Sequence, residues 1–179
     1  MGNRGGRFHR DDSSLGARRW ASKRWIACVC EFRGRRREVW GAGYTELFFL
    51  DEVTALSAGH RPCFECRRPD ALAFARAFVA GAPAPSADAM DAILHGQRLA
   101  RQGATLGAAA LARLPDGAMV ADRDGAYAMR GPLALPWHFE GYGPPVARAA
   151  LRDAQALTPP AILGALGAGY VPRWSASAG

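Results

Sequence analysis

The chain has 179 residues, of which 49% are hydrophobic and 22% charged, and it carries a net charge of +7. This composition excludes general disorder and predicts one globular domain, or one domain with a small annex. No run of about 18 apolar residues occurs, so we expect neither a membrane-spanning helix nor a membrane partner. Residues 1–10 are polar and Arg-rich, which is unlike a secretory signal and favours a cytoplasmic protein.

The positive charge lies at one end of the sequence. Residues 1–40 hold 11 basic and 4 acidic side chains, whereas residues 41–179 hold 12 of each. Ten of the 11 basic residues are arginine, whose guanidinium group forms paired hydrogen bonds with phosphate. This pattern predicts a contact with nucleic acid or another polyanion. An Arg-rich solvated surface explains it equally well.

The first part of the chain predicts an irregular arm followed by a strand. Residues 1–19 are polar and contain four glycines, which is typical of irregular structure. Residues 20–32 are rich in β-branched and aromatic side chains and favour a strand. Because side chains alternate along a strand, Cys28 and Cys30 would share one face.

Helices are predicted in the middle of the chain. Asp51 is a suitable N-cap for a short helix over residues 52–57, and a longer helix is expected over residues 71–80. The Gly- and Pro-rich stretch 81–86 breaks this helix, and another is expected over about residues 88–101, with Ser86 or Asp88 as its cap.

The pattern changes beyond residue 114. Turn signals rich in Asp, Gly and Pro recur every seven or eight residues and separate short apolar runs. They predict an antiparallel β-meander over about residues 115–140. Thr158 is then a candidate cap for a last helix, which has prolines in its first turn.

These elements predict an α+β protein in three parts. An irregular basic arm covers residues 1–19, and a small α/β module covers residues 20–82. Residues 83–179 form an α+β region that begins with a helix and contains the small antiparallel meander.

The four cysteines form two close pairs, Cys28 with Cys30 and Cys63 with Cys66. Without an export signal, we expect thiols in place of disulfides. The Cys63-x-x-Cys66 spacing forms a tight knuckle in which both sulfurs reach one zinc ion, at about 2.3 Å each. The second pair then makes a zinc site the preferred interpretation.

The fourth ligand is open at this point. On a strand, Cys28 and Cys30 lie about 6–7 Å apart at Cα, so both reach one zinc only if the strand bends. Otherwise a histidine would complete the site, and the candidates are His9, His60 and His95.

The run FFLDEVTALSAGHRPCFECRRPD, from Phe48 to Asp70, resembles the metal-binding domain of Ada, the bacterial DNA alkylation-repair family. It shares with that family a Phe-rich strand, a short Ala-rich helix ending in Ala-Gly, and an Arg-Pro-Cys-x-x-Cys-Arg run. With the upstream cysteines, the resemblance extends over about residues 20–80. His60 takes a place that an aromatic residue fills in the family.

The resemblance implies a small α/β domain that binds one zinc through four cysteines, here Cys28, Cys30, Cys63 and Cys66. It also implies contact with DNA, and a methyl-accepting zinc thiolate at the first cysteine of the upstream pair, which is Cys28. The chain also departs from the family at the upstream pair. One residue separates Cys28 from Cys30 where the family has three, and the Arg-Pro that follows the acceptor cysteine in the family is absent here.

Three functions follow as hypotheses. The first is a binding module that presents an Arg-rich region to nucleic-acid phosphates, with the contacts assigned to Arg33, Arg35, Arg36 and Arg37. The second is an enzyme or alkyl acceptor in which Cys28 reacts as a zinc thiolate. In the third, the zinc is purely structural and fastens a protein-interaction module.

Overall fold

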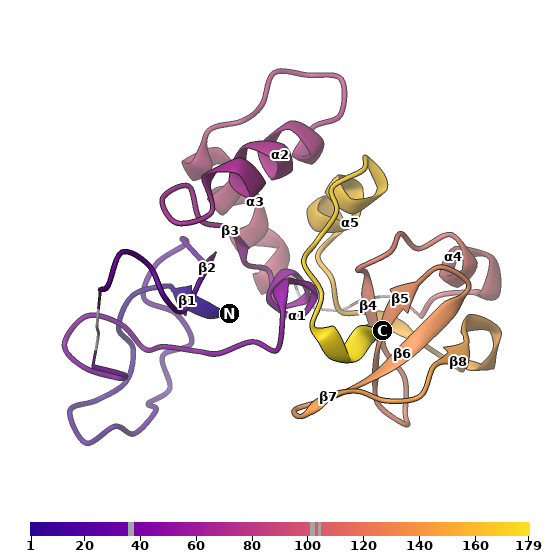
Figure 1. The fold of residues 1–179 in the computed structure, drawn as a ribbon, viewed down its shortest axis with the longest axis horizontal. Coiled ribbons are helices and arrows are strands. Elements are labelled where there is room, and N and C mark those ends of the chain that lie inside the picture. Colours follow the sequence, from indigo (N-terminus) through magenta and orange to yellow (C-terminus); the bar gives the residue numbers. More distant parts are fainter. Residues whose placement is uncertain (36–37, 101–102, 104) are drawn as a thin grey trace.

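The computed structural model describes residues 1–35, 38–100, 103 and 105–179 (Figure 1). It confirms the α+β class. The strands are β1 (Gly2–Arg4), β2 (Ile26–Cys28), β3 (Arg61–Pro62), β4 (Met119–Ala121), β5 (Ala126–Arg130), β6 (Leu133–His138), β7 (Gly141–Tyr142), β8 (Val146–Ala147) and β9 (Gln155–Ala156). The helices are α1 (Glu52–Ser57), α2 (Arg68–Phe78), α3 (Ala87–Leu99), α4 (Ala108–Ala112) and α5 (Pro160–Gly167), with 3-10 turns η1 (Arg148–Ala150) and η2 (Ala176–Ala178).

The strands form two separate sheets, with helix α1 between them (Figure 1). The small sheet has the order β1-β2-β3, in which β1 is antiparallel and β3 parallel to β2. The larger sheet has the order β7-β6-β5-β4-β9, and β8 also pairs with β6. Its central strands β4, β5 and β6 are consecutive and antiparallel, which confirms the predicted meander.

One helical core joins the two halves of the chain. Buried side chains from α1, α2, α3 and α5 pack together, and Tyr170 closes the cluster after α5. Its buried members are Leu56, Phe74, Ala75, Phe78, Met90, Leu94, Ile162, Ala165, Leu166 and Tyr170. The helices on both sides of the predicted 82/83 limit therefore share one core.

The local signals at both ends of α1 and at the start of α3 act as expected. Asp51 caps α1 by accepting a hydrogen bond from the Thr54 amide at 2.9 Å, and Ser86 caps α3 by accepting from the Ala89 amide at 3.2 Å. Gly59 follows α1 with a φ of +80°, a conformation that an L side chain rarely adopts. Gly59 therefore lets the chain leave α1 and turn into β3.

Several elements differ from the sequence expectations. Residues 2–4 form strand β1 within the segment expected to be irregular, and β2 is shorter than residues 20–32. Thr158 does not cap α5; its hydroxyl accepts a hydrogen bond from the Met119 amide at 2.8 Å instead.

Among the described residues, no helix is both long enough and apolar enough to cross a membrane.

Candidate metal centre

Parallel pairing of β2 with β3 brings two distant cysteines together. Ala27 is paired with Pro62, and the next residue of each segment is a cysteine: Cys28, the last residue of β2, and Cys63, directly after β3. The Cys63 amide donates to the Ala27 carbonyl at 3.1 Å, which fixes this register. A slip by one residue would turn one of the two cysteines away from the other.

The third cysteine comes from the tight turn after β3. The Arg67 amide donates to the Cys63 carbonyl at 3.0 Å and closes the turn just before α2. Within it, the Glu65 amide points at the Cys63 sulfur, 3.3 Å away. The turn therefore places Cys66 beside Cys63 and supplies a backbone donor to one sulfur.

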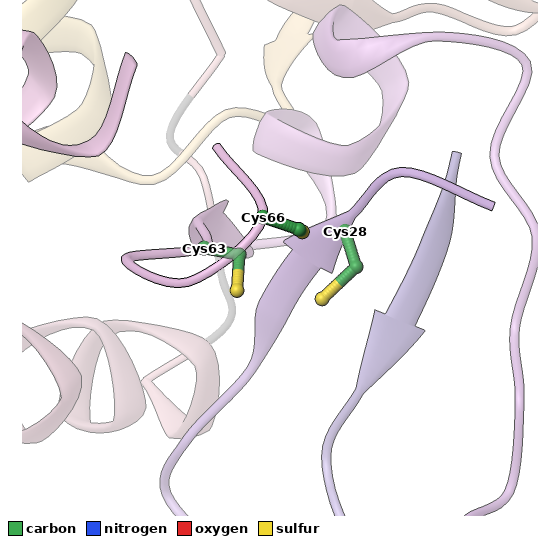
Figure 2. A group of neighbouring side chains, drawn as sticks. All are labelled: Cys28, Cys63 and Cys66. Carbon is green, nitrogen blue, oxygen red and sulfur yellow. The ribbon is translucent and has the colours of Figure 1, made fainter. Parts of the chain in front are cut away.

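The sulfurs of Cys28, Cys63 and Cys66 lie within 4.8 Å of one another. Figure 2 shows Cys28 at the end of β2, opposite Cys63 and Cys66 on the turn. All three are free thiols and none forms a disulfide. A tetrahedral zinc with bonds of about 2.3 Å holds its sulfurs roughly 3.8 Å apart. If the distances between the sulfurs shortened by an ångström or less, the three sulfurs would therefore fit around one metal ion.

An arginine that the sequence analysis did not single out bridges the sulfurs. The Arg4 Nε donates to the Cys28 sulfur at 3.3 Å, and its Nη2 donates to the Cys63 sulfur at 3.0 Å. The same Nη2 lies 2.9 Å from the Glu65 carboxylate. Because Arg4 sits on β1, the pairing of β1 with β2 delivers a positive charge to the cluster.

The three thiols are not electrostatically equivalent. The pKa of Cys63 falls to about 4, first because its sulfur accepts a hydrogen bond from Cys28, and also because backbone amides and Arg4 donate to it. The same hydrogen bond, together with burial, raises the pKa of Cys28. Burial likewise raises the pKa of Cys66. Without a cation, the cluster therefore favours a single thiolate, on Cys63.

Cys30 lies outside this group. It is exposed, and the strand that would have carried it on the same face as Cys28 ends at Cys28. The structure thus brings together three of the four cysteines predicted as ligands. Cys28, the candidate methyl acceptor, is buried, with 9% of its surface exposed.

The three candidate histidines also lie outside the group. His9 stacks on Trp40, with 5.2 Å between ring centroids, and its Nδ1 lies 2.7 Å from the Thr45 hydroxyl. His60 is buried against the rings of Trp25 and Phe49. His95, on helix α3, packs edge-on against the ring of Trp20.

Two of the four arginines predicted to contact nucleic acid can be placed. Arg33 and Arg35 are both exposed, and the guanidinium groups of both lie over the Phe32 ring. Arg35 also pairs with the Glu65 carboxylate at 2.7 Å. Arg36 and Arg37 lie outside the described residues.

No local sequence signal marks Arg4 as a neighbour of the cluster. It lies 24 residues from Cys28 and 59 residues from Cys63 along the chain. Only the long-range pairing of β1 brings it there.

Comparisons of the chain with protein-family models, curated proteins and solved structures found no match.

Proposed function

We propose that this chain is a zinc-binding protein in which Cys28, Cys63 and Cys66 hold one zinc ion. The observation that carries the proposal is the convergence of three free sulfurs within 4.8 Å, close to the spacing that tetrahedral zinc requires. When bound, zinc would keep the sulfurs deprotonated and supply folding free energy.

The donors around the sulfurs support this assignment. Thiolate ligands are stabilised by hydrogen bonds from outside the ligand set, and this site has the Glu65 amide and the Arg4 guanidinium in those places. Thiolate-rich tetrahedral sites select zinc, copper(I) or iron–sulfur clusters. The knuckle spacing and the resemblance of residues 20–80 to the Ada metal-binding domain favour zinc among these.

The first experiment measures zinc content and thiol count on the purified, reduced chain. We expect one zinc per chain in the unmodified protein. Cys63→Ser should lose the metal and destabilise the fold, because a structural zinc contributes on the order of 10 kcal/mol. Cys30→Ser is the matched control and should keep its zinc. Zinc well below one equivalent in the unmodified protein, or equal loss in both variants, would contradict the assignment.

We further propose that the Arg-rich N-terminal region contacts nucleic acid, DNA in preference to RNA. The specific observation is that basic side chains of residues 1–40 remain at the surface after folding. Within the described part of this range, the exposed ones are Arg10, Arg18, Arg19, Lys23, Arg24, Arg33 and Arg35. Side chains of this kind neutralise backbone phosphates and release counterions, so binding should depend steeply on salt.

The test is the salt dependence of binding to a labelled DNA duplex. If three or four phosphates are neutralised, the log–log slope should be about −3. Replacing Arg33, Arg35, Arg36 and Arg37 together by Ala should weaken binding and flatten the slope. A control of equal charge replaces four exposed arginines elsewhere, Arg76, Arg113, Arg123 and Arg152. Equal losses of DNA affinity in the two variants, or an affinity of the unmodified chain that does not change with salt, would exclude this interface.

A further inference from the structure

A cavity of ≈ 240 Å³ opens directly beside the three-cysteine centre. Cys28 and Cys66 form part of its lining, whereas Cys63 does not. Two of the three proposed ligands therefore border the same open space. A small molecule in this cavity would reach the centre from the side between Cys28 and Cys66.

Much of the cavity wall is apolar and faces solvent. Phe32, Val39 and Phe48 line it, and Val39 and Phe48 are 57% and 62% exposed. Single exposed apolar side chains are common on protein surfaces, but a group of them around one cavity marks a binding site. At ≈ 240 Å³ the cavity lies below the range of about 300–1,000 Å³ typical of small-molecule pockets, so its occupant is compact.

The described part of the chain brings no fourth metal-binding side chain into the cysteine group. Cys30 lines the same cavity but is exposed and lies outside the group. The Glu65 carboxylate is bound by the guanidinium groups of Arg4 and Arg35, at 2.9 and 2.7 Å. Three protein ligands leave one position of a tetrahedral metal for another molecule.

We propose that the fourth coordination position of the centre faces this cavity and binds a compact, apolar thiol from solution. The proposal rests on the metal site proposed above. The apolar body of the thiol packs against Phe32, Val39 and Phe48. On binding, its S–H bond breaks, the proton passes to solvent, and the sulfur takes the place of a water on the metal.

The ligand type of the site favours a thiol over a hard anion. Three cysteine thiolates form a soft ligand set, which suits a fourth sulfur. The cavity lining holds two arginines, Arg4 and Arg35, and two carboxylates, Glu46 and Glu65, so its charges balance. A thiol reaches the cavity uncharged and loses its proton only at the metal, so its entry needs no net charge in the lining.

The experiment uses cobalt(II) in place of zinc, in the full reduced chain and with a thiol-free reductant. The thiolate-to-cobalt charge-transfer band reports the number of bound sulfurs. The unmodified chain and Cys30→Ser should take up one cobalt with the same band intensity. Adding ethanethiol should raise that intensity by about one third, as three thiolates become four. Phe48→Ser should bind cobalt equally well but require more ethanethiol.

Other outcomes separate the two proposals. A weaker band in Cys30→Ser, with no response of the unmodified chain to ethanethiol, would assign the fourth position to Cys30 and overturn this inference alone. A response to imidazole or inorganic phosphate in place of ethanethiol would overturn the thiol assignment. If the band responds to none of the three ligands, the fourth position is closed to added molecules, which would also overturn this inference. Failure of both proteins to bind cobalt would overturn the metal site itself.

Discussion

His60 shows how one residue can look like a metal ligand in the sequence and serve as a packing residue in the fold. Its ring lies between Trp25 and Phe49, with centroid distances of 5.0 and 4.7 Å. Burial, together with the charge of Arg98, lowers the pKa of His60 to about 3. The imidazole is therefore neutral in the folded protein, and it occupies the place that the Ada resemblance gives to an aromatic residue.

This burial predicts a pH-dependent stability. The unfolded chain takes up the His60 proton near pH 6.5, whereas the folded protein resists it down to about pH 3. The contribution of neutral His60 to the free energy of unfolding is therefore fully present above pH 6.5. As the pH falls from 6.5 towards 3, this contribution decreases by up to about 1.4 kcal/mol per pH unit. His60→Phe should remove this pH dependence. Between pH 7 and pH 5, the free energy of unfolding of the variant should therefore fall by about 2 kcal/mol less than that of the unmodified chain.

Urea midpoints at the two pH values measure this difference, with all proteins at equal zinc loading. The exposed His138, replaced by Phe, serves as the control, and its variant should follow the unmodified chain. If His60→Phe loses as much stability as the unmodified chain, then His60 is not held neutral by its surroundings.

At the scale of elements, the small sheet positions the centre. Strand β2 carries Cys28, β3 leads directly into Cys63, and β1 carries Arg4 across to both sulfurs. The candidate metal site is therefore a product of strand pairing between segments far apart in the chain. A change on β1 should alter the site even though β1 supplies no proposed ligand.

Arg4→Ala tests this role of β1. Its removal leaves the sulfurs of Cys28 and Cys63 without their guanidinium donor, so the centre should release zinc more readily, by about tenfold. The rate of zinc transfer to a chromophoric chelator measures the effect. Arg19→Ala removes an exposed arginine and should leave the rate unchanged. Equal rates in both variants would mean that Arg4 does not stabilise the thiolates.

Local signals predicted those elements that are decided within a few residues. The Asp51 and Ser86 caps act where expected, because each bonds an amide three residues ahead. Strand β1 escaped prediction because Gly-Asn-Arg has no strand propensity and forms a strand only by pairing with β2. The short α4 (Ala108–Ala112) was missed for a related reason: it has no side-chain cap, and only Leu111 in it is buried.

The candidate site was predictable in part. The Cys63-x-x-Cys66 knuckle follows from its spacing, and Cys28 was expected beside it from the second cysteine pair and the Ada resemblance. The position of Cys30 does not, because β2 ends at Cys28 and the expected alternation stops there. The contacts of Arg4 depend on strand pairing over long separations, which no local pattern encodes.

At the scale of the whole molecule, α1 ties the half that carries the cysteine cluster to the end of the chain. The Glu52 carboxylate is buried and pairs with Arg67 at 2.6 Å. It also accepts hydrogen bonds from the Tyr170 hydroxyl at 2.6 Å and from the Arg173 amide at 2.9 Å. The neighbouring Asp51 carboxylate accepts from Tyr142 and Ser175.

Glu52→Gln should therefore destabilise the entire chain. Removing one partner of a buried ion pair typically costs about 3–5 kcal/mol, because the other charge is left poorly compensated. Denaturant unfolding should show a lower midpoint in a single transition, because the helical core spans both halves. The exposed Glu140, replaced by Gln, is the control. A loss below about 1 kcal/mol, or two separate transitions, would contradict this view of the fold.

X-ray absorption at the zinc edge of the purified protein, in thiol-free buffer, tests the metal centre most directly. The structure predicts three sulfurs at about 2.3 Å and one lighter donor at about 2.0–2.1 Å. This signal should disappear in Cys63→Ser and persist in Cys30→Ser. A zinc shell made only of oxygen and nitrogen donors, or no bound zinc at all, would contradict a centre built from Cys28, Cys63 and Cys66.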